Sequence, residues 1–162
     1  MLGLKDLLVP KNGNEIFLEK NMNKIKGRIY RVSASGVEDI KFEIDLRNNK
    51  ARVVINEGYK VTIRGIRNEC LFNCVESRIK VLLDELNKTN CVQRTFFRKI
   101  KIENLSGGVV ASTRKIKIWT SDFEVEVKTP VDFETNFDNI RTTVLALFNV
   151  LGKLDFYVSL IV

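Results

Sequence analysis

Apolar and polar residues alternate strictly in the first half of the chain. From Val37 to Leu46 the apolar residues Ile40, Phe42 and Ile44 are separated by polar ones. Alternation of this kind predicts a β-strand with one face in a core and the other in water, as in an antiparallel sheet. Similar segments bounded by turn residues predict further strands at residues 25–31, 51–56 and 59–66.

The pattern becomes helical after Asn68, a residue suited to capping a helix start. Apolar residues then recur at intervals of three and four until about Asn87, which predicts a helix with one apolar stripe. The stripe consists of Leu71, Phe72, Val75, Ile79, Leu82, Leu83 and Leu86.

The second half of the chain follows the same order. Strands are predicted at residues 97–105, 109–119 and 123–127, and Thr129-Pro130 then predicts the start of a helix that ends at Gly152. The apolar positions of this helix match those of the first helix at a constant offset. We therefore expect one α+β domain over residues 1–162, with antiparallel sheets and a pseudo-repeated plan of strands then helix at about 24–88 and 96–152.

The two ends of the chain are apolar. Residues 2–9 predict a short amphipathic helix ended by Pro10. Residues 155–162 are almost entirely apolar and β-prone, so we expect them to pair with a sheet or with a neighbouring subunit. This favours a homo-oligomer, at least a dimer.

The amino-acid composition favours a polyanionic partner. The net charge is +7 and the isoelectric point is near 9.4, which favours electrostatic capture of polyanions. No run approaches the roughly 20 apolar residues of a membrane helix, so no membrane partner is expected. The odd cysteine count (Cys70, Cys74 and Cys91) favours reduced thiols and a cytoplasmic, intracellular location.

The chain has no histidine. This excludes Ser-His-Asp and Cys-His catalysis and most zinc and iron sites. The three cysteines lack a fourth ligand of the usual type, and small half-buried core residues are the favoured interpretation. Neither a P-loop nor a GxGxxG motif occurs. We therefore predict no catalytic residue, no metal and no cofactor.

Three predicted strands carry basic side chains and an aromatic ring opposite their isoleucines. Since side chains alternate between the faces of a strand, these residues share the outer face if the isoleucines point inward. Cations can follow phosphates while bases stack on the rings, at ~1–3 kcal/mol each. The candidate nucleic-acid-binding residues are Lys24, Lys26, Arg28 and Tyr30 in the first strand, Phe97, Lys99 and Lys101 in the second, and Lys115, Lys117 and Trp119 in the third.

The same pattern also fits an ordinary solvated surface, because exposed faces of antiparallel strands are often rich in lysine. Other predicted strands expose acidic residues, among them Glu43, Asp45, Glu124 and Glu126. If all strands belong to one sheet, acidic side chains interrupt the basic surface.

The closing segment VEVKTPVDFETNFDNIRTTVLALFNVL leads from a strand through a proline turn into a helix. With the repeated order of strands and helix over residues 24–151, it resembles the Whirly family of single-strand binders, and also PUR repeats and the positive-cofactor-type coactivators. The Whirly lysine-glycine-lysine-alanine signature is absent, and Lys26-Gly27-Arg28 is its nearest counterpart. The resemblance implies single-stranded nucleic acid bound along sheet surfaces and assembly through the helices.

Three functions follow from these patterns. The favoured one is a nucleic-acid-binding protein without catalysis, which binds single-stranded DNA or RNA on basic, aromatic sheet faces. The first alternative is a structural or adaptor subunit of an oligomeric complex, including a virion component, because both ends are apolar. The second is a metal-dependent nuclease built from carboxylates, which needs no histidine.

Overall fold

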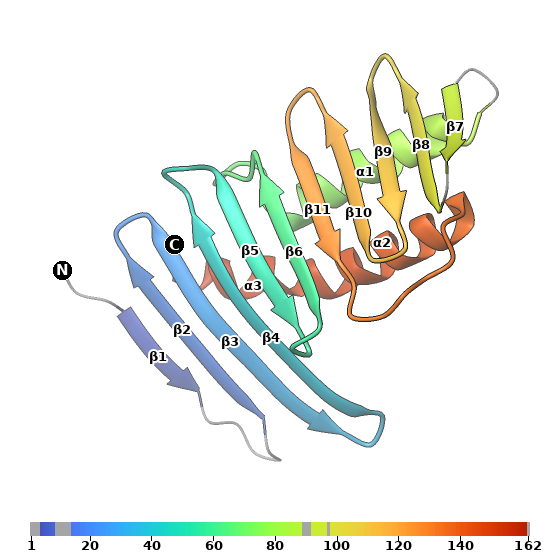
Figure 1. The fold of residues 1–162 in the computed structure, drawn as a ribbon. Coiled ribbons are helices and arrows are strands. Elements are labelled where there is room, and N and C mark those ends of the chain that lie inside the picture. Colours follow the sequence, from blue (N-terminus) through green and yellow to red (C-terminus); the bar gives the residue numbers. More distant parts are fainter. Residues whose placement is uncertain (1–3, 9–13, 89–91, 97, 162) are drawn as a thin grey trace.

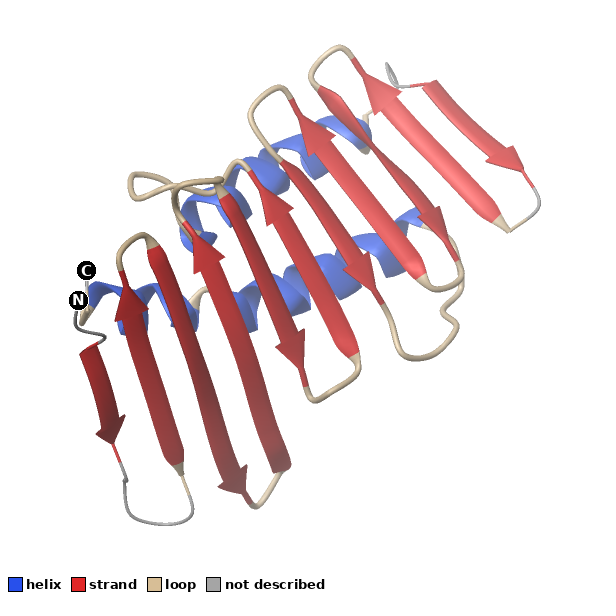
Figure 2. Cartoon of the chain, turned by 60° about the vertical axis from the view of Figure 1, so that its left-hand side comes forward, coloured by secondary structure: helices blue, strands red, loops and turns tan. Residues whose placement is uncertain are grey.

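The described residues form one large antiparallel sheet with helices on one side (Figures 1 and 2). The computed structural model describes residues 4–8, 14–88, 92–96 and 98–161. The sheet has eleven strands in the order β1-β2-β3-β4-β5-β6-β11-β10-β9-β8-β7. The strands are β1 (Leu4–Leu8), β2 (Glu15–Asn21), β3 (Lys24–Ser33), β4 (Gly36–Asp45), β5 (Lys50–Ile55), β6 (Tyr59–Arg64), β7 (Val92–Phe96), β8 (Lys99–Asn104), β9 (Gly107–Ser112), β10 (Lys115–Thr120) and β11 (Glu124–Lys128).

The sheet consists of two runs of hairpins joined at one seam. Strands β1 to β6 follow one another in space, and helix α1 (Phe72–Leu86) then carries the chain to the far edge. Strands β7 to β11 return toward the middle, where β11 pairs with β6. At this seam Val61 lies opposite Val127 and Ile63 lies opposite Val125. This one pairing makes the two runs a continuous sheet.

The core lies between the sheet and its helices. Helices α1 and α2 (Phe137–Leu151) lie across one face, and α3 (Lys153–Ser159) continues from α2 toward β3 and β4 (Figures 1 and 2). Alternate residues of the central strands and the apolar stripes of the helices are buried there. They include Ile25, Ile29, Ile44, Val53, Ile63, Ile79, Ile102, Ile118, Val125 and Phe148. No described element covers the opposite face of the sheet, which we call the open face.

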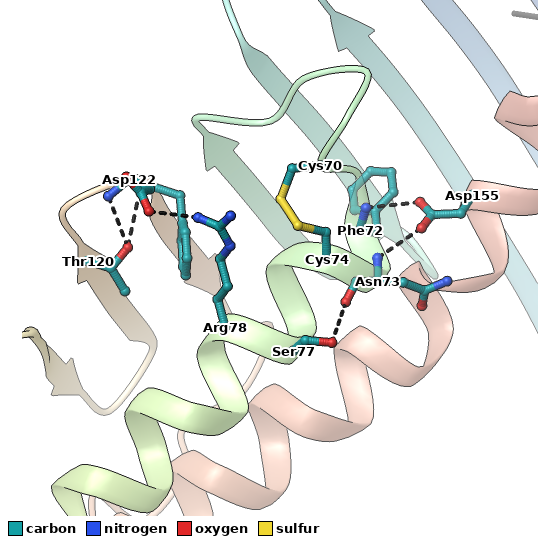
Figure 3. The surroundings of a disulfide bond; sticks show 10 residues. Cys70, Phe72, Asn73, Cys74, Ser77, Arg78, Thr120, Asp122 and Asp155 are labelled. Atoms are coloured by element: carbon teal, nitrogen blue, oxygen red, sulfur yellow. Dashed lines mark hydrogen bonds and ion pairs between the residues drawn. A yellow bond between two sulfur atoms is a disulfide. The ribbon is translucent and has the colours of Figure 1, made fainter.

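The start of α1 is held by the C-terminal part of the chain (Figure 3). Its N-cap residue, Leu71, provides no side-chain acceptor. Instead the carboxylate of Asp155 in α3 accepts hydrogen bonds from the backbone N–H groups of Phe72 and Asn73, both at 2.9 Å. These bonds favour the charged carboxylate, but burial outweighs them and raises the pKa of Asp155 above its ordinary value of 3.8. The helix start therefore depends on a residue more than eighty positions away in the sequence.

The same helix start contains a disulfide between Cys70 and Cys74 (Figure 3). The expectation of reduced thiols was wrong for this pair, because the turn from Cys70 into α1 brings the two Cα atoms to 5.0 Å, within the range that a disulfide bridges. Cys91 lies outside the described residues. The cysteine count therefore no longer supports the expected intracellular location, which stays a prediction.

The balanced α+β pseudo-repeat was also wrong, because the protein is mostly β. The segment 109–119, expected as one strand, is the hairpin β9–β10, with a turn at Thr113-Arg114. Strands β2 and β7 were not predicted, since neither has a clear alternation of apolar residues. With these additions the strands of the described residues form a single sheet.

The predictions for the two chain ends and the second helix start also fail. Residues 4–8 of the predicted helix 2–9 form strand β1, because β2 offers a partner edge. The tail forms α3 instead of a strand, and Leu154, Tyr157 and Val158 are buried. Helix α2 is capped by Asn136, which accepts from the N–H of Asn139 at 2.8 Å, rather than by Thr129.

Truncating the seam should destabilise the whole sheet. Ile63 is fully buried at the β6–β11 pairing, so Ile63→Ala should lower the free energy of unfolding by about 2–5 kcal/mol. The matched control is Thr62→Ala on the open face of the same strand, which should change it by no more than about 0.5 kcal/mol. Urea unfolding of both variants measures this. Equal effects would contradict the assignment of the two faces.

Removing the distant cap should weaken α1. Asp155→Ala should cost about 1 kcal/mol, whereas Asp138→Ala, in the exposed first turn of α2, should cost little. Since the raised pKa means that folding favours the protonated carboxyl, the contribution of Asp155 is greatest below pH 3.8 and declines as the pH rises through the raised value. The unfolding free energies of wild type and Asp155→Ala, measured across this range, should converge as the pH increases. A gap that widens with pH would contradict this.

Candidate nucleic-acid interface

The described candidate residues project from the open face. On β3, Lys24, Lys26, Arg28 and Tyr30 alternate with the buried Ile25 and Ile29. The same alternation holds on the other two strands, where Lys99 and Lys101 lie on β8, and Lys115, Lys117 and Trp119 lie on β10. Phe97 lies outside the described residues.

The three candidate strands are not neighbours. Strands β4, β5, β6 and β11 lie between β3 and β10, so five steps of about 4.8 Å separate the latter two by about 24 Å. Strand β9 lies between β10 and β8. The structure therefore does not gather the predicted residues into one cluster but distributes them across a broad surface.

The intervening strands supply basic residues that sequence reasoning did not include among the candidates. They share the open face because the strands alternate in register with β3 and β10. They are Lys41 on β4, Lys50 and Arg52 on β5, Lys60 and Arg64 on β6, and Lys128 on β11. Arg94 on the edge strand β7 lies opposite Lys101 and also belongs to this face. The alternation of apolar and polar residues within each segment indicates to which face these basic side chains point. Only the strand order shows that they are neighbours.

The open face carries the excess positive charge of the described residues. Its basic side chains are Lys24, Lys26, Arg28, Lys41, Lys50, Arg52, Lys60, Arg64, Arg94, Lys99, Lys101, Lys115, Lys117 and Lys128. Its acidic side chains are Glu15, Glu19, Asp39, Glu43, Asp45, Glu103, Glu124 and Glu126. Fourteen basic residues thus face eight acidic ones, whereas α1, α2 and α3 together carry four basic and five acidic residues. The two sides of the molecule differ in charge.

Ion pairs neutralise part of this surface, as expected if all strands share one sheet. Lys115 lies 3.4 Å from Glu126, and Lys117 lies 3.3 Å from Glu124. Further pairs join Arg64 to Glu124, Lys101 to Glu103 and Lys128 to Glu126. Exposed pairs of this kind contribute only about 0–1 kcal/mol each. A polyanion can therefore compete with the carboxylates at small cost.

Arg28 is held more firmly than the lysines. Its guanidinium donates to both carboxylate oxygens of Asp39, at 3.0 and 3.1 Å. The hydrogen bond and the charge of Asp39 raise the pKa of Arg28. Arg28 also lies 5.5 Å from the centre of the Tyr30 ring, a cation–π distance. This contact fixes an aromatic ring beside a cation on the open face.

Other cations have no such partner. In the part of the chain that the structure describes, no carboxylate lies within ion-pair distance of Lys26, Lys41, Arg52 or Lys60. Lys41 and Lys60 flank Val54 across β4, β5 and β6. These strands therefore present the cations most accessible to a ligand.

The indole of Trp119 lies against the backbone of β9. Gly108 is opposite Trp119 in the register, and a Cβ atom at Gly108 would lie only 2.6 Å from Cζ2 of the indole. The ring thus rests on the open face over Gly108 and remains partly exposed. Because Trp119 is the single tryptophan of the chain, tryptophan fluorescence reports on this face alone.

Among the described residues, no group of three or more Cys, Asp or Glu side chains is placed to hold a metal ion. Cys70 and Cys74, once joined in a disulfide, are not thiolate ligands.

None of the described helices is long and apolar enough to cross a bilayer.

Comparison with known proteins leaves the arrangement to be interpreted from its geometry. No protein-family model, no curated protein and no solved structure matches this chain.

Displacing the indole should test the geometry of the open face. Gly108→Ala should push the ring away from β9, because the new methyl group would overlap Cζ2. We expect a shifted Trp119 emission maximum and a less stable protein, by about 1–3 kcal/mol. The matched control Ser112→Ala, on the same face of β9, should leave the emission unchanged. An unchanged spectrum in a folded Gly108→Ala protein would contradict the contact.

Proposed function

We propose that this protein binds nucleic acid on the open face of its sheet. The observation that carries the proposal is the separation of charge, with an excess of basic side chains on the one large surface that no described element covers. A polyanion would be attracted to this face and not to the helical side, whose charges nearly balance. Nucleic acid is the polyanion that also uses the partly exposed rings of Tyr30 and Trp119, because bases stack on aromatic side chains.

The exposed ion pairs are compatible with this function. Each lysine held by a carboxylate can turn to a phosphate, since the pair it leaves contributes little to stability. The carboxylates would at the same time weaken the affinity, so binding should be moderate and strongly dependent on salt. Catalysis plays no part in the proposal.

The adaptor alternative was based on the apolar chain ends, and the structure leaves less of the C-terminal end exposed than the sequence indicated. Part of the apolar tail is buried in α3, although Phe156 and Leu160 remain 63% and 51% exposed. Assembly into a homo-oligomer stays a prediction, and measurement of the mass in solution with and without nucleic acid tests it separately.

Neutralising the open face should weaken binding to nucleic acid. Lys41→Gln/Lys115→Gln removes two charges from this face. Because two phosphate contacts are lost, we expect the affinity for a labelled oligonucleotide of about 15 nucleotides to fall roughly 25-fold at 0.1 M salt. Fluorescence anisotropy at two salt concentrations measures this.

The control variant loses the same charge from the other side of the molecule. Lys80→Gln/Lys88→Gln, in and just after α1, should bind as the wild type does. If wild-type protein does not bind oligonucleotides at low salt, or if both double variants lose affinity equally, the proposal is wrong.

A further inference from the structure

One row of the open face contains basic residues and no carboxylate. Strand register places Arg28, Lys41, Val54, Lys60, Lys128 and Lys115 opposite one another in turn, from β3 to β10. We call the five cations of this row, Arg28, Lys41, Lys60, Lys128 and Lys115, the basic file. It crosses six adjacent strands, a span of about 24 Å at about 4.8 Å per strand. Its direction is perpendicular to the strands.

The next row along the strands is mixed. It runs through Lys26, Glu43, Arg52, Thr62, Glu126 and Lys117. The row beyond it runs through Lys24, Asp45, Lys50, Arg64, Glu124 and Trp119. Carboxylates interrupt both rows, although Lys50 and Arg64 are neighbours in the second one, so neither row is free of negative charge along its length.

The opposite side of the basic file is also limited by acidic residues. There Tyr30 lies between Glu15 and Asp39. Glu126 approaches the file from its own row, at 3.4 Å from Lys115 and 4.0 Å from Lys128. The open face thus has one row of cations that contains Val54 but no carboxylate, with acidic residues on both sides.

We infer that the ligand of the open face is an extended single strand of nucleic acid, with its one phosphate backbone lying along the basic file across the strands. This inference rests on the proposed function. A duplex presents two phosphate backbones separated by a groove of about 6 or 12 Å, and it would need two lines of cations. Carboxylates occupy the rows where the second backbone would lie.

The ends of the file indicate where bases are held. At the β3 end, Phe17 lies opposite Arg28, and Tyr30 lies beside it on the same strand. At the β10 end, Trp119 is four residues from Lys115, about 14 Å along the strand. Bases attached to a backbone on the file therefore reach Tyr30 and Phe17 more directly than Trp119.

The test compares two variants that lose equal charge from the same face. Lys41→Gln/Lys60→Gln removes two members of the basic file, and Lys24→Gln/Lys50→Gln removes two cations from a mixed row. The probes are labelled deoxythymidine single strands and a mixed-sequence duplex, each about 15 nucleotides or base pairs long. Circular dichroism checks that both double variants are folded. If Lys41→Gln/Lys60→Gln is unfolded, the single variants Lys41→Gln and Lys60→Gln are measured in its place.

The salt dependence gives the number of phosphate contacts. Each phosphate contact with a single strand contributes about −0.7 to the slope of log affinity against log salt concentration. Five contacts therefore predict a slope of about −3.5. Lys41→Gln/Lys60→Gln should reduce the slope to about −2.1, whereas Lys24→Gln/Lys50→Gln should leave it near the wild-type value. Wild-type protein should bind the single strand more tightly than the duplex.

The remaining outcomes separate this inference from the proposed function. If the duplex binds more tightly, or if the two double variants lose affinity equally, nucleic-acid binding stands and the basic file is not its path. If wild-type protein binds neither probe, both the inference and the proposed function fail.

Discussion

The pairing of β6 with β11 is the interaction on which the rest of the structure depends. It joins two runs of hairpins that are far apart in the sequence, and it does so with buried valine and isoleucine side chains facing the helices. Because the pairing keeps the strand alternation in register, the apolar residues of β6 and β11 and of the strands beside them point toward the same core. A shift by one residue would exchange the faces of one half and place its lysines against the helices.

The electrostatic character of the open face follows from this geometry. Helices α1, α2 and α3 bury one side of the sheet, so most charged strand residues lie on the other. Arg31 and Glu38 are exceptions, since they contact Tyr157 and Lys153 of α3. Within that surface, cross-strand register decides which cations are paired and which are free. Lys115 and Lys117 have glutamates nearby, whereas Lys41 and Lys60 have only Val54 between them. The surface is therefore basic as a whole, and the row from Arg28 to Lys115 crosses it without a carboxylate.

The helical side shows the same dependence on distant contacts. Leu71 cannot cap α1, and the carboxylate of Asp155 takes that role from α3. Arg78 of α1 also pairs with Asp122 of the β10–β11 turn at 2.6 Å (Figure 3). Two residues from distant parts of the second half of the chain, Asp122 and Asp155, thus help to fix one helix on the sheet. The local sequence signal for the start of that helix is weak.

The sequence by itself determined the direction of side chains within the strands it predicted, and the apolar stripes of α1 and α2, because both depend on a local period of two or about 3.6 residues. It misjudged residues 4–8 and the tail, since short apolar segments fit either period and their partners decide the structure. Only the tertiary structure decided which strands are neighbours, how Asp155 caps α1, and that Arg28, Lys41, Lys60, Lys128 and Lys115 share a row. The physical reason is that strand pairing joins backbone groups of residues far apart in the chain, which no local pattern records.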